Sequence, residues 1–140
     1  DLIYYDYVEE KMYKWSNTPL SSKTIEILTK DFDFGQPSVR KKVYKVYVSY
    51  KGDASAVTVK YGVNGETDDS DLFQFNSNNT PLGDKSSTEN KESWHLAELK
   101  PTTSADANNI YSFQLKFAGT AAIDFEINDI SIVYRSKQIK

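Results

Sequence analysis

Hydrophobic and polar residues alternate with a period of two over much of this chain. The clearest run spans residues 43–50 and follows a turn at Gly35–Ser38. One side of the run carries Tyr44, Val46, Val48 and Tyr50, and the other carries Lys45, Tyr47 and Ser49. Alternating aromatic and β-branched residues are typical of a half-buried strand. We therefore predict a central strand with the first set in the core and the second set available to a partner or a glycan.

Shorter alternating runs predict the remaining strands of the domain. They cover residues 24–29, 57–61, 72–75, 94–99, 111–117, 123–127 and 130–134. Turns are expected at Gly52-Asp53, Asn64-Gly65 and Gly119-Thr120. The first of these turns would make a hairpin of the strands 43–50 and 57–61. Polar loops are expected over 76–91 and 100–109. About eight to ten short strands predict an all-β fold, an antiparallel β-sandwich of jelly-roll type.

The last strand pattern changes phase. Ile123, Phe125 and Ile127 occupy odd positions, whereas Ile130, Ile132 and Tyr134 occupy even ones. A slip of one residue turns every side chain to the opposite face unless a bulge absorbs it. We therefore predict a β-bulge or a strand break at Asn128-Asp129.

The first residues form a pattern of their own. Two aromatic runs, 2–8 and 12–15, flank Glu9–Lys11 and predict a hairpin, and 16–22 is a polar linker that contains Pro19. We divide the chain into residues 1–22, a hairpin and linker that could end a preceding domain, and the sandwich domain 23–140. Because the chain begins with Asp1 in mid-pattern, we expect it to be either a fragment of a longer polypeptide or a processed chain.

Composition narrows the function classes. With 140 residues, 17 basic and 20 acidic side chains and a net charge of -3, the chain fits one domain without a basic nucleic-acid footprint. Apolar runs are too short for a membrane span, so we expect neither nucleic acid nor membrane as a partner. The absence of cysteine removes disulfides, thiolate metal sites and cysteine nucleophiles.

Candidate catalytic groups are few. The single histidine, His95, is predicted to point away from Trp94 and Leu96, toward solvent or a groove, whereas a triad would hold it buried beside a nucleophile. Asp31 and Asp33 share a predicted strand face and could serve glycosidase chemistry, but any two same-face neighbours reach that spacing. A solvated surface is therefore the simpler interpretation, and we expect no enzyme.

An acidic loop is the candidate metal site. Asp68, Asp69 and Asp71 lie in residues 64–71 together with Glu66. Calcium prefers six to eight hard oxygen ligands from such loops, so a structural Ca²⁺ is possible, although the spacing differs from an EF-hand and a hydrated loop is simpler. No other cofactor is expected. The basic run Arg40–Lys42 is interpreted as a solvated turn.

Exposed aromatic residues are the candidate ligand or partner surface. Trp15, Tyr47 and Trp94, with His95 beside Trp94, are the members. Aromatic ring faces stack on the apolar faces of pyranose rings, so a glycan is one possible ligand. Packing in the core or against a neighbouring domain is the alternative.

Several segments together resemble the C-terminal part of tail or other virion structural proteins of bacteriophages. They are Lys11–Ser16, Thr29–Gly35, Arg40–Val48 and Asn128–Arg135. In such proteins the segment resembling Met12–Ser16 can end a β-propeller-like region, and the part from about Thr24 resembles an appended β-sandwich. Val57–Gly65 also resembles the strand and turn of carbohydrate-binding or discoidin jelly-roll modules.

The resemblance implies a non-enzymatic structural or interaction module of a phage virion, located in the particle. Its partners would be other virion proteins or its own upstream domain, bound through the sheet surfaces. The alternative is a secreted carbohydrate-binding module that uses exposed aromatic residues, with or without a structural calcium. The resemblance transfers no catalytic residue.

Overall fold

A computed structural model describes residues 3–7, 10–14, 23–83, 93–122 and 124–137. The strands of these residues are β1 (Ile3–Asp6), β2 (Lys11–Lys14), β3 (Lys23–Leu28), β4 (Lys41–Lys51), β5 (Val57–Val63), β6 (Phe73–Gln74), β7 (His95–Leu99), β8 (Asn108–Ile110), β9 (Phe113–Ala121) and β10 (Glu126–Ser136). Every strand pair is antiparallel. The predicted all-β class is confirmed.

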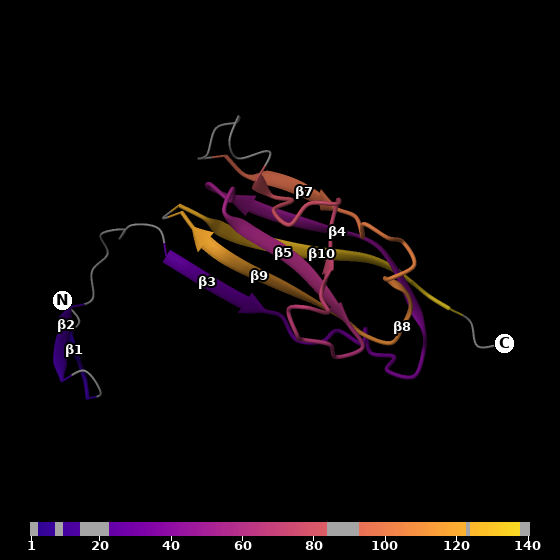
Figure 1. Cartoon of the computed structure of the whole chain (residues 1–140), viewed down its shortest axis with the longest axis horizontal. Helices are drawn as coiled ribbons and strands as arrows, with labels where there is room; N and C mark the ends of the chain where they lie inside the picture. The colour runs from indigo at the N-terminus through magenta and orange to yellow at the C-terminus, as the bar shows by residue number, and fades with distance from the viewer. Residues whose placement is uncertain (1–2, 8–9, 15–22, 84–92, 123, 138–140) are drawn as a thin grey trace.

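Two four-stranded sheets form the sandwich (Figure 1). The first, which we call the β9 sheet, has the order β3-β9-β5-β6. The second, which we call the β4 sheet, has the order β10-β4-β7, and β8 pairs with the beginning of β4. The antiparallel β-sandwich is therefore confirmed, and its jelly-roll type stays a prediction. β1 and β2 pair with each other in a separate hairpin, near the predicted positions.

The core lies between the inner faces of the two sheets. Its fully buried side chains include Val46, Val48 and Tyr50 of β4, Val57, Val59 and Tyr61 of β5, and Phe113, Leu115 and Phe117 of β9. Each large apolar side chain buried in this way contributes about 1.5–3 kcal/mol. The period-two patterns of these strands thus specify the inner faces, as the sequence predicted for 46–50, 57–61 and 113–117.

The connection after β4 differs from the prediction. β4 and β5 do not form a hairpin, because β4 belongs to one sheet and β5 to the other. Residues 52–56 cross between the layers, and Gly52 adopts a φ of 88° at the start of the crossing. Both strands bury alternate residues in the same core. Their alternating patterns therefore fit two strands that face each other across the core as well as two strands that are hydrogen-bonded neighbours.

The expected turn at Gly119-Thr120 is also wrong, because β9 continues through both residues to Ala121. Gly119 lies between Ile25 of β3 and Val57 of β5 and has a φ of 127°. A Cβ at this position would collide with the carbonyl oxygen of Ala56. Glycine here allows two backbones within the sheet to approach closely. A glycine inside a strand pattern can therefore mark such a contact as well as a turn.

Two bulges shape the pairing of β4 with β10. The register passes from Ile127 opposite Tyr50 to Asp129 opposite Ser49, which leaves Asn128 without a partner and confirms the predicted bulge. A second shift lies between Val133 and Tyr134 and leaves Tyr44 as the extra residue of β4. The prediction that Tyr44 enters the core is wrong, because this bulge turns Tyr44 outward and Val43 inward.

Candidate interaction surfaces

The outer face of the β4 sheet is organised around Glu98 of β7. Its Oε2 accepts a 2.9 Å hydrogen bond from the hydroxyl of Tyr47 and a 3.0 Å bond from the Nζ of Lys45, both on the adjacent β4. Its Oε1 lies 2.6 Å from the Nζ of Lys100. Tyr47 and Lys45 face outward because Val46 and Val48 occupy the inner face, as the alternation predicted. The three donors hold one carboxylate in a fixed position on the sheet.

The same contacts shift the pKa values of this cluster. Hydrogen bonds from Lys100, Lys45 and Tyr47 to the carboxylate lower the pKa of Glu98 to about 2. The hydrogen bonds of Lys45 with Tyr47 and Glu98 raise the pKa of the Lys45 ammonium above its ordinary value. Both groups are therefore charged at neutral pH.

Lysine side chains cover the aromatic rings of this face. The Nζ of Lys45 lies 5.0 Å from the ring centroid of Tyr47, that of Lys42 lies 5.2 Å from Tyr44, and that of Lys51 lies 5.3 Å from Trp94. Ammonium groups at this distance are attracted by the electrons of the ring face. The aromatic rings and the cations therefore form one combined surface.

Among the described residues, the outer face has more cations than anions. It carries Lys42, Lys45, Lys51, Lys100 and Arg135 together with Glu98, Glu126 and Asp129. The described part of this face is thus net positive, although the whole chain has a net charge of -3. Such a surface favours a partner that combines apolar or ring-shaped groups with negative charge.

The structure separates the predicted surface residues. Tyr47 and Trp94 both lie on the outer face, and Trp94 is 50% exposed. Since Tyr47 is opposite Glu98 and Tyr50 is opposite His95, the two aromatic residues lie roughly 13 Å apart along the strand direction. Trp15 lies outside the described residues.

The prediction that His95 faces solvent or a groove is wrong. His95 is only 8% exposed, and its ring centroid lies 5.7 Å from that of Tyr50. The inner face of β7 is formed by His95, Ala97 and Leu99, which leaves Trp94 and Leu96 outside. The sequence was ambiguous here because Leu96 and Leu99 lie on opposite faces of a strand and only one of them can enter the core.

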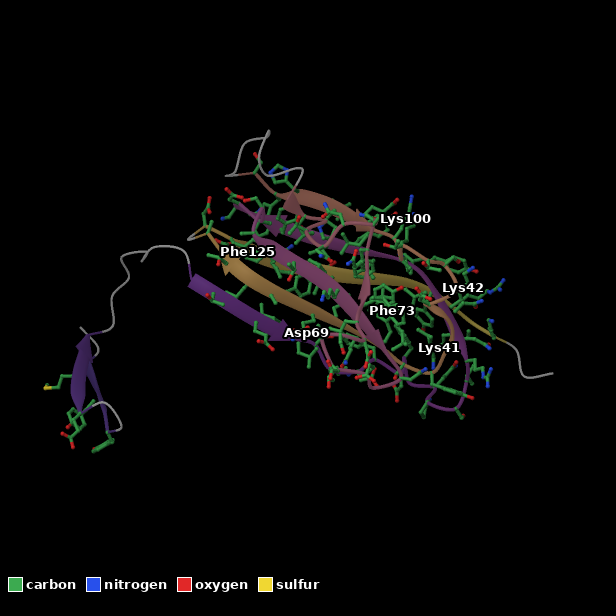
Figure 2. The ribbon with its side chains drawn as sticks, in the orientation of Figure 1. Lys41, Lys42, Asp69, Phe73, Lys100 and Phe125 are labelled. Atoms are coloured by element: carbon green, nitrogen blue, oxygen red, sulfur yellow. The ribbon has the colours of Figure 1, made fainter. Side chains whose placement is uncertain are left out.

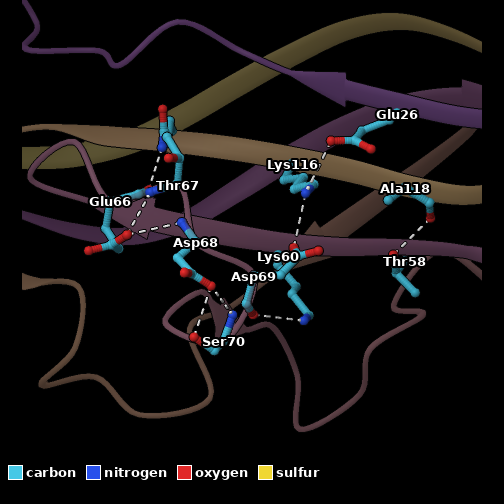
Figure 3. A network of polar contacts seen from close by, with 11 residues as sticks. Glu26, Thr58, Lys60, Glu66, Thr67, Asp68, Asp69, Ser70, Lys116 and Ala118 are labelled. Carbon is cyan, nitrogen blue, oxygen red and sulfur yellow. Dashed lines mark hydrogen bonds and ion pairs between the residues drawn. The ribbon is translucent and has the colours of Figure 1, made fainter.

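The acidic loop folds back on the outer face of the β9 sheet (Figure 3). Lys116 of β9 lies between Asp69, at 3.0 Å, and Glu26 of β3, at 3.2 Å. Asp68 accepts hydrogen bonds from the backbone N–H and the hydroxyl of Ser70, and these bonds lower the pKa of Asp68. Two of the predicted calcium ligands are therefore held by different partners.

No group of three or more His, Asp or Glu side chains suited to a metal ion occurs among the described residues. Asp71 is exposed, and its backbone N–H bonds to the carbonyl of Asp68.

The predicted carboxylate pair, Asp31 and Asp33, makes hydrogen bonds within the fold. Asp31 accepts a 2.6 Å bond from the hydroxyl of Ser112, and Asp33 accepts a 2.8 Å bond from the backbone N–H of Gly35.

One charged side chain that the sequence placed in a solvated turn is fully buried. The Nζ of Lys41 donates to the carbonyl oxygens of Gln36 at 2.6 Å, Val39 at 2.8 Å and Tyr111 at 2.8 Å. Lys41 and its neighbour Lys42 are labelled in Figure 2, and Lys42 is only partly buried. Lys41 thus connects the turn before β4 to the end of β8 and acts as a structural cation.

The hairpin presents a second candidate surface. Tyr5 of β1 pairs with Met12 of β2, and the Tyr5 ring contacts that of Tyr7 edge to face, with centroids 4.9 Å apart. Tyr7 is 86% exposed and Met12 is 72% exposed. Three large apolar side chains therefore gather in a small element and remain open to solvent.

No family model, curated protein or solved structure matches this chain. Among the described residues, no helix has the length and hydropathy needed to cross a membrane.

Proposed function

We propose that this chain is a non-enzymatic structural module of a bacteriophage virion, of the tail type, that joins neighbouring virion proteins or its own upstream domain. The exposed apolar side chains of the hairpin support the proposal most directly. The virion assignment itself rests on the resemblance of the strand segments to virion proteins.

The hairpin favours a partner for an energetic reason. An isolated two-stranded hairpin is only marginally stable in water, because it has no second layer to cover its apolar side chains. Tyr5, Tyr7 and Met12 would each gain stability by packing against another surface. Exposed apolar clusters of this kind commonly mark contact sites for other proteins.

Labelling of particles tests the virion assignment. Antibodies raised against the sandwich should bind assembled particles from the source of this sequence, and the chain should be found in purified particles by mass spectrometry. If the chain is made during infection but is absent from purified particles, the assignment is wrong.

Variants of the hairpin test its role in assembly. Met12→Glu should reduce incorporation of the chain into particles, because it places a charge within the apolar surface. Gln74→Glu, at an exposed position of β6 in the sandwich, is the matched control and should be incorporated normally. Equal incorporation of both variants would contradict a docking role for the hairpin.

A second candidate function is glycan binding on the outer face of the β4 sheet. Trp94 and Tyr47 lie on the same face, and the lysines beside them supply hydrogen-bond donors. This arrangement is suited to a saccharide that carries negative charge, since the ring stacks on apolar sugar faces and the ammonium groups pair with carboxylate or sulfate.

A glycan array that includes acidic saccharides tests this candidate. Trp94→Ala should abolish the signal. Tyr111→Ala should not, because Tyr111 is a similarly exposed aromatic residue that follows β8, and β8 pairs with the opposite end of β4. An array without any signal, or equal effects of the two substitutions, would exclude glycan binding on this face.

A further inference from the structure

The outer edge of strand β3 forms a second kind of surface. β3 stands at the end of the β9 sheet and pairs with β9. Within the part of the chain that the structure describes, no strand pairs with its other edge. The backbone groups on that edge therefore determine what could bind there.

Hydrogen bonds around β9 identify the outward residues of β3. On one side of β9, the N–H of Thr120 donates to Ala56 at 3.1 Å, so even-numbered residues bond toward β5. On the other side, the N–H of Thr29 donates to Leu115 at 2.9 Å, so odd-numbered residues bond toward β3. Successive residues of an antiparallel strand alternate in this way.

The register converts this alternation into a pattern on β3. Ile25 is opposite Gly119 and Ile27 is opposite Phe117, so these two residues bond to β9. The backbone N–H and C=O groups of Thr24, Glu26 and Leu28 consequently point away from the sheet. Three donors and three acceptors are available to an added strand.

The other long edge of the sandwich carries features that discourage strand addition. β10 has the Asn128 bulge and the charged residues Glu126, Asp129 and Arg135. Bulges and charges are common protections of edge strands. β3 has six residues without a bulge or proline, and it leaves Ile27 and Leu28 partly exposed.

We infer that β3 binds the β3 strand of a second copy of this chain, antiparallel and about a two-fold axis centred on Glu26. This register pairs Thr24 with Leu28 and Ile25 with Ile27, and each outward residue meets an outward residue of the partner. Donors and acceptors then match at every position. The two β9 sheets become one continuous sheet with a symmetric interface.

Side chains support the same register. On the inner face, Ile25 of each copy packs beside Ile27 of the other, a β-branched pair that stabilises adjacent strands. On the outer face, the two Glu26 carboxylates are neighbours, but each lies 3.2 Å from the ammonium of its own Lys116. The like charges are therefore compensated within each copy. This symmetry favours a second copy over an unrelated strand.

Residue-resolved amide hydrogen exchange tests the interface directly. At low protein concentration, the amides of Glu26 and Leu28 should exchange rapidly while those of Ile25 and Ile27 are protected. At high concentration, all four should be protected. Association that leaves Glu26 and Leu28 rapid, for example association that protects the hairpin instead, would overturn the inference and would leave the hairpin proposal standing.

Two substitutions at one position provide the matched test by sedimentation. Glu26→Pro removes an outward N–H and no bond to β9, so the monomer should fold while dimerisation weakens about tenfold or more. Glu26→Ala loses the same side chain but retains the N–H, and it should still dimerise. Ile27→Lys retains every backbone bond and should also weaken dimerisation, because its charge would be buried between the copies. A monomeric wild type at all concentrations, or dimerisation of Glu26→Pro equal to that of Glu26→Ala, would overturn the inference.

Discussion

The hydroxyl of Tyr47 on β4 donates a 2.9 Å hydrogen bond to Glu98, which lies directly opposite it on β7. The bond joins two strands on the outer face of the sandwich and belongs to a cluster with Lys45 and Lys100. A carboxylate with three donors remains ionised under conditions in which most carboxylates are protonated. The cluster therefore connects the stability of the β4 sheet to pH.

Glu98→Gln should reduce the acid sensitivity of folding. The pKa of Glu98 is about 2 in the folded chain, below its ordinary value of 4.5. The ionised carboxylate thus stabilises the fold above the ordinary value, and this contribution is lost as pH falls from 4.5 to about 2. The variant should be less stable than the wild type at neutral pH, and the difference in the free energy of unfolding should shrink across this window. The pH slopes of the two proteins should differ by about one bound proton at most.

Urea unfolding at a series of pH values measures this effect. Glu126→Gln is the control, because Glu126 is a carboxylate of the same face that is paired with Lys51 at 3.1 Å. Because it loses a carboxylate with one lysine partner, it should cost less stability at neutral pH than Glu98→Gln does. A difference between wild type and Glu98→Gln that stays constant from neutral pH to pH of about 2 would contradict the depressed pKa of Glu98.

Lys41→Met should destabilise the sandwich by about 3 kcal/mol, because three carbonyl oxygens lose the ammonium group that they accept from. The aliphatic part of the side chain is retained, so lost packing contributes little. Lys42→Met is the matched control at the next position. Its side chain is partly exposed beside Tyr44, and the free energy of unfolding should change by about 0.5 kcal/mol or less. Similar values for the two variants in denaturant titrations would show that the carbonyl contacts of Lys41 contribute little.

Local patterns predicted most of the strands and one of the two bulges between β4 and β10. β8 (Asn108–Ile110) was missed, because its first two residues belong to the stretch 100–109 that was predicted to be a polar loop. The run at 46–50 alternates without interruption, and its inner residues are fully buried. The phase change at Asn128 is visible because apolar residues on both sides of it pack against the core. The Tyr44 bulge gives no such signal, because Tyr44 fits either face of a strand and its position is decided by the register of β10.

Long-range contacts explain what the sequence did not predict. The three acceptors of Lys41 are backbone carbonyls from two separate loops, so no residue type marks them. Leu96 and Leu99 lie on opposite faces of β7, and His95 shares its face with Leu99. Which of the two faces enters the core depends on the packing of the opposite sheet. The free edge of β3 follows from strand order, which depends on the three-dimensional packing of both sheets.

Gly119→Ala should destabilise the domain by about 3 kcal/mol or more, since the new Cβ would collide with the carbonyl of Ala56 in addition to the strain of a φ of 127°. Gly35→Ala is the matched control. Gly35 also has a positive φ, of 72°, but a Cβ there meets no atom within 4 Å, so we expect a cost of about 1 kcal/mol. Thermal unfolding of both variants compares the steric contribution with the conformational one. Equal losses would show that β9 can move away from Ala56 at little cost.

Two fully buried tyrosines should respond differently to loss of the hydroxyl. The hydroxyl of Tyr50 donates a 2.7 Å bond to the carbonyl of Leu82, so Tyr50→Phe should lower the free energy of unfolding by about 1–2 kcal/mol. The hydroxyl of Tyr61 has no hydrogen-bond partner among the described residues, and its ring stacks on those of Phe73 and Phe113.

Burial, with a smaller effect from Asp106, raises the pKa of the Tyr61 hydroxyl, which indicates an apolar surrounding that disfavours the charged form. Tyr61→Phe removes a polar group from this surrounding and retains the ring stacking. The free energy of unfolding should therefore stay unchanged or rise by up to about 1 kcal/mol. Urea titration of both variants in the same buffer makes the comparison. A loss of stability in Tyr61→Phe as large as that in Tyr50→Phe would show that the Tyr61 hydroxyl is hydrogen-bonded in solution.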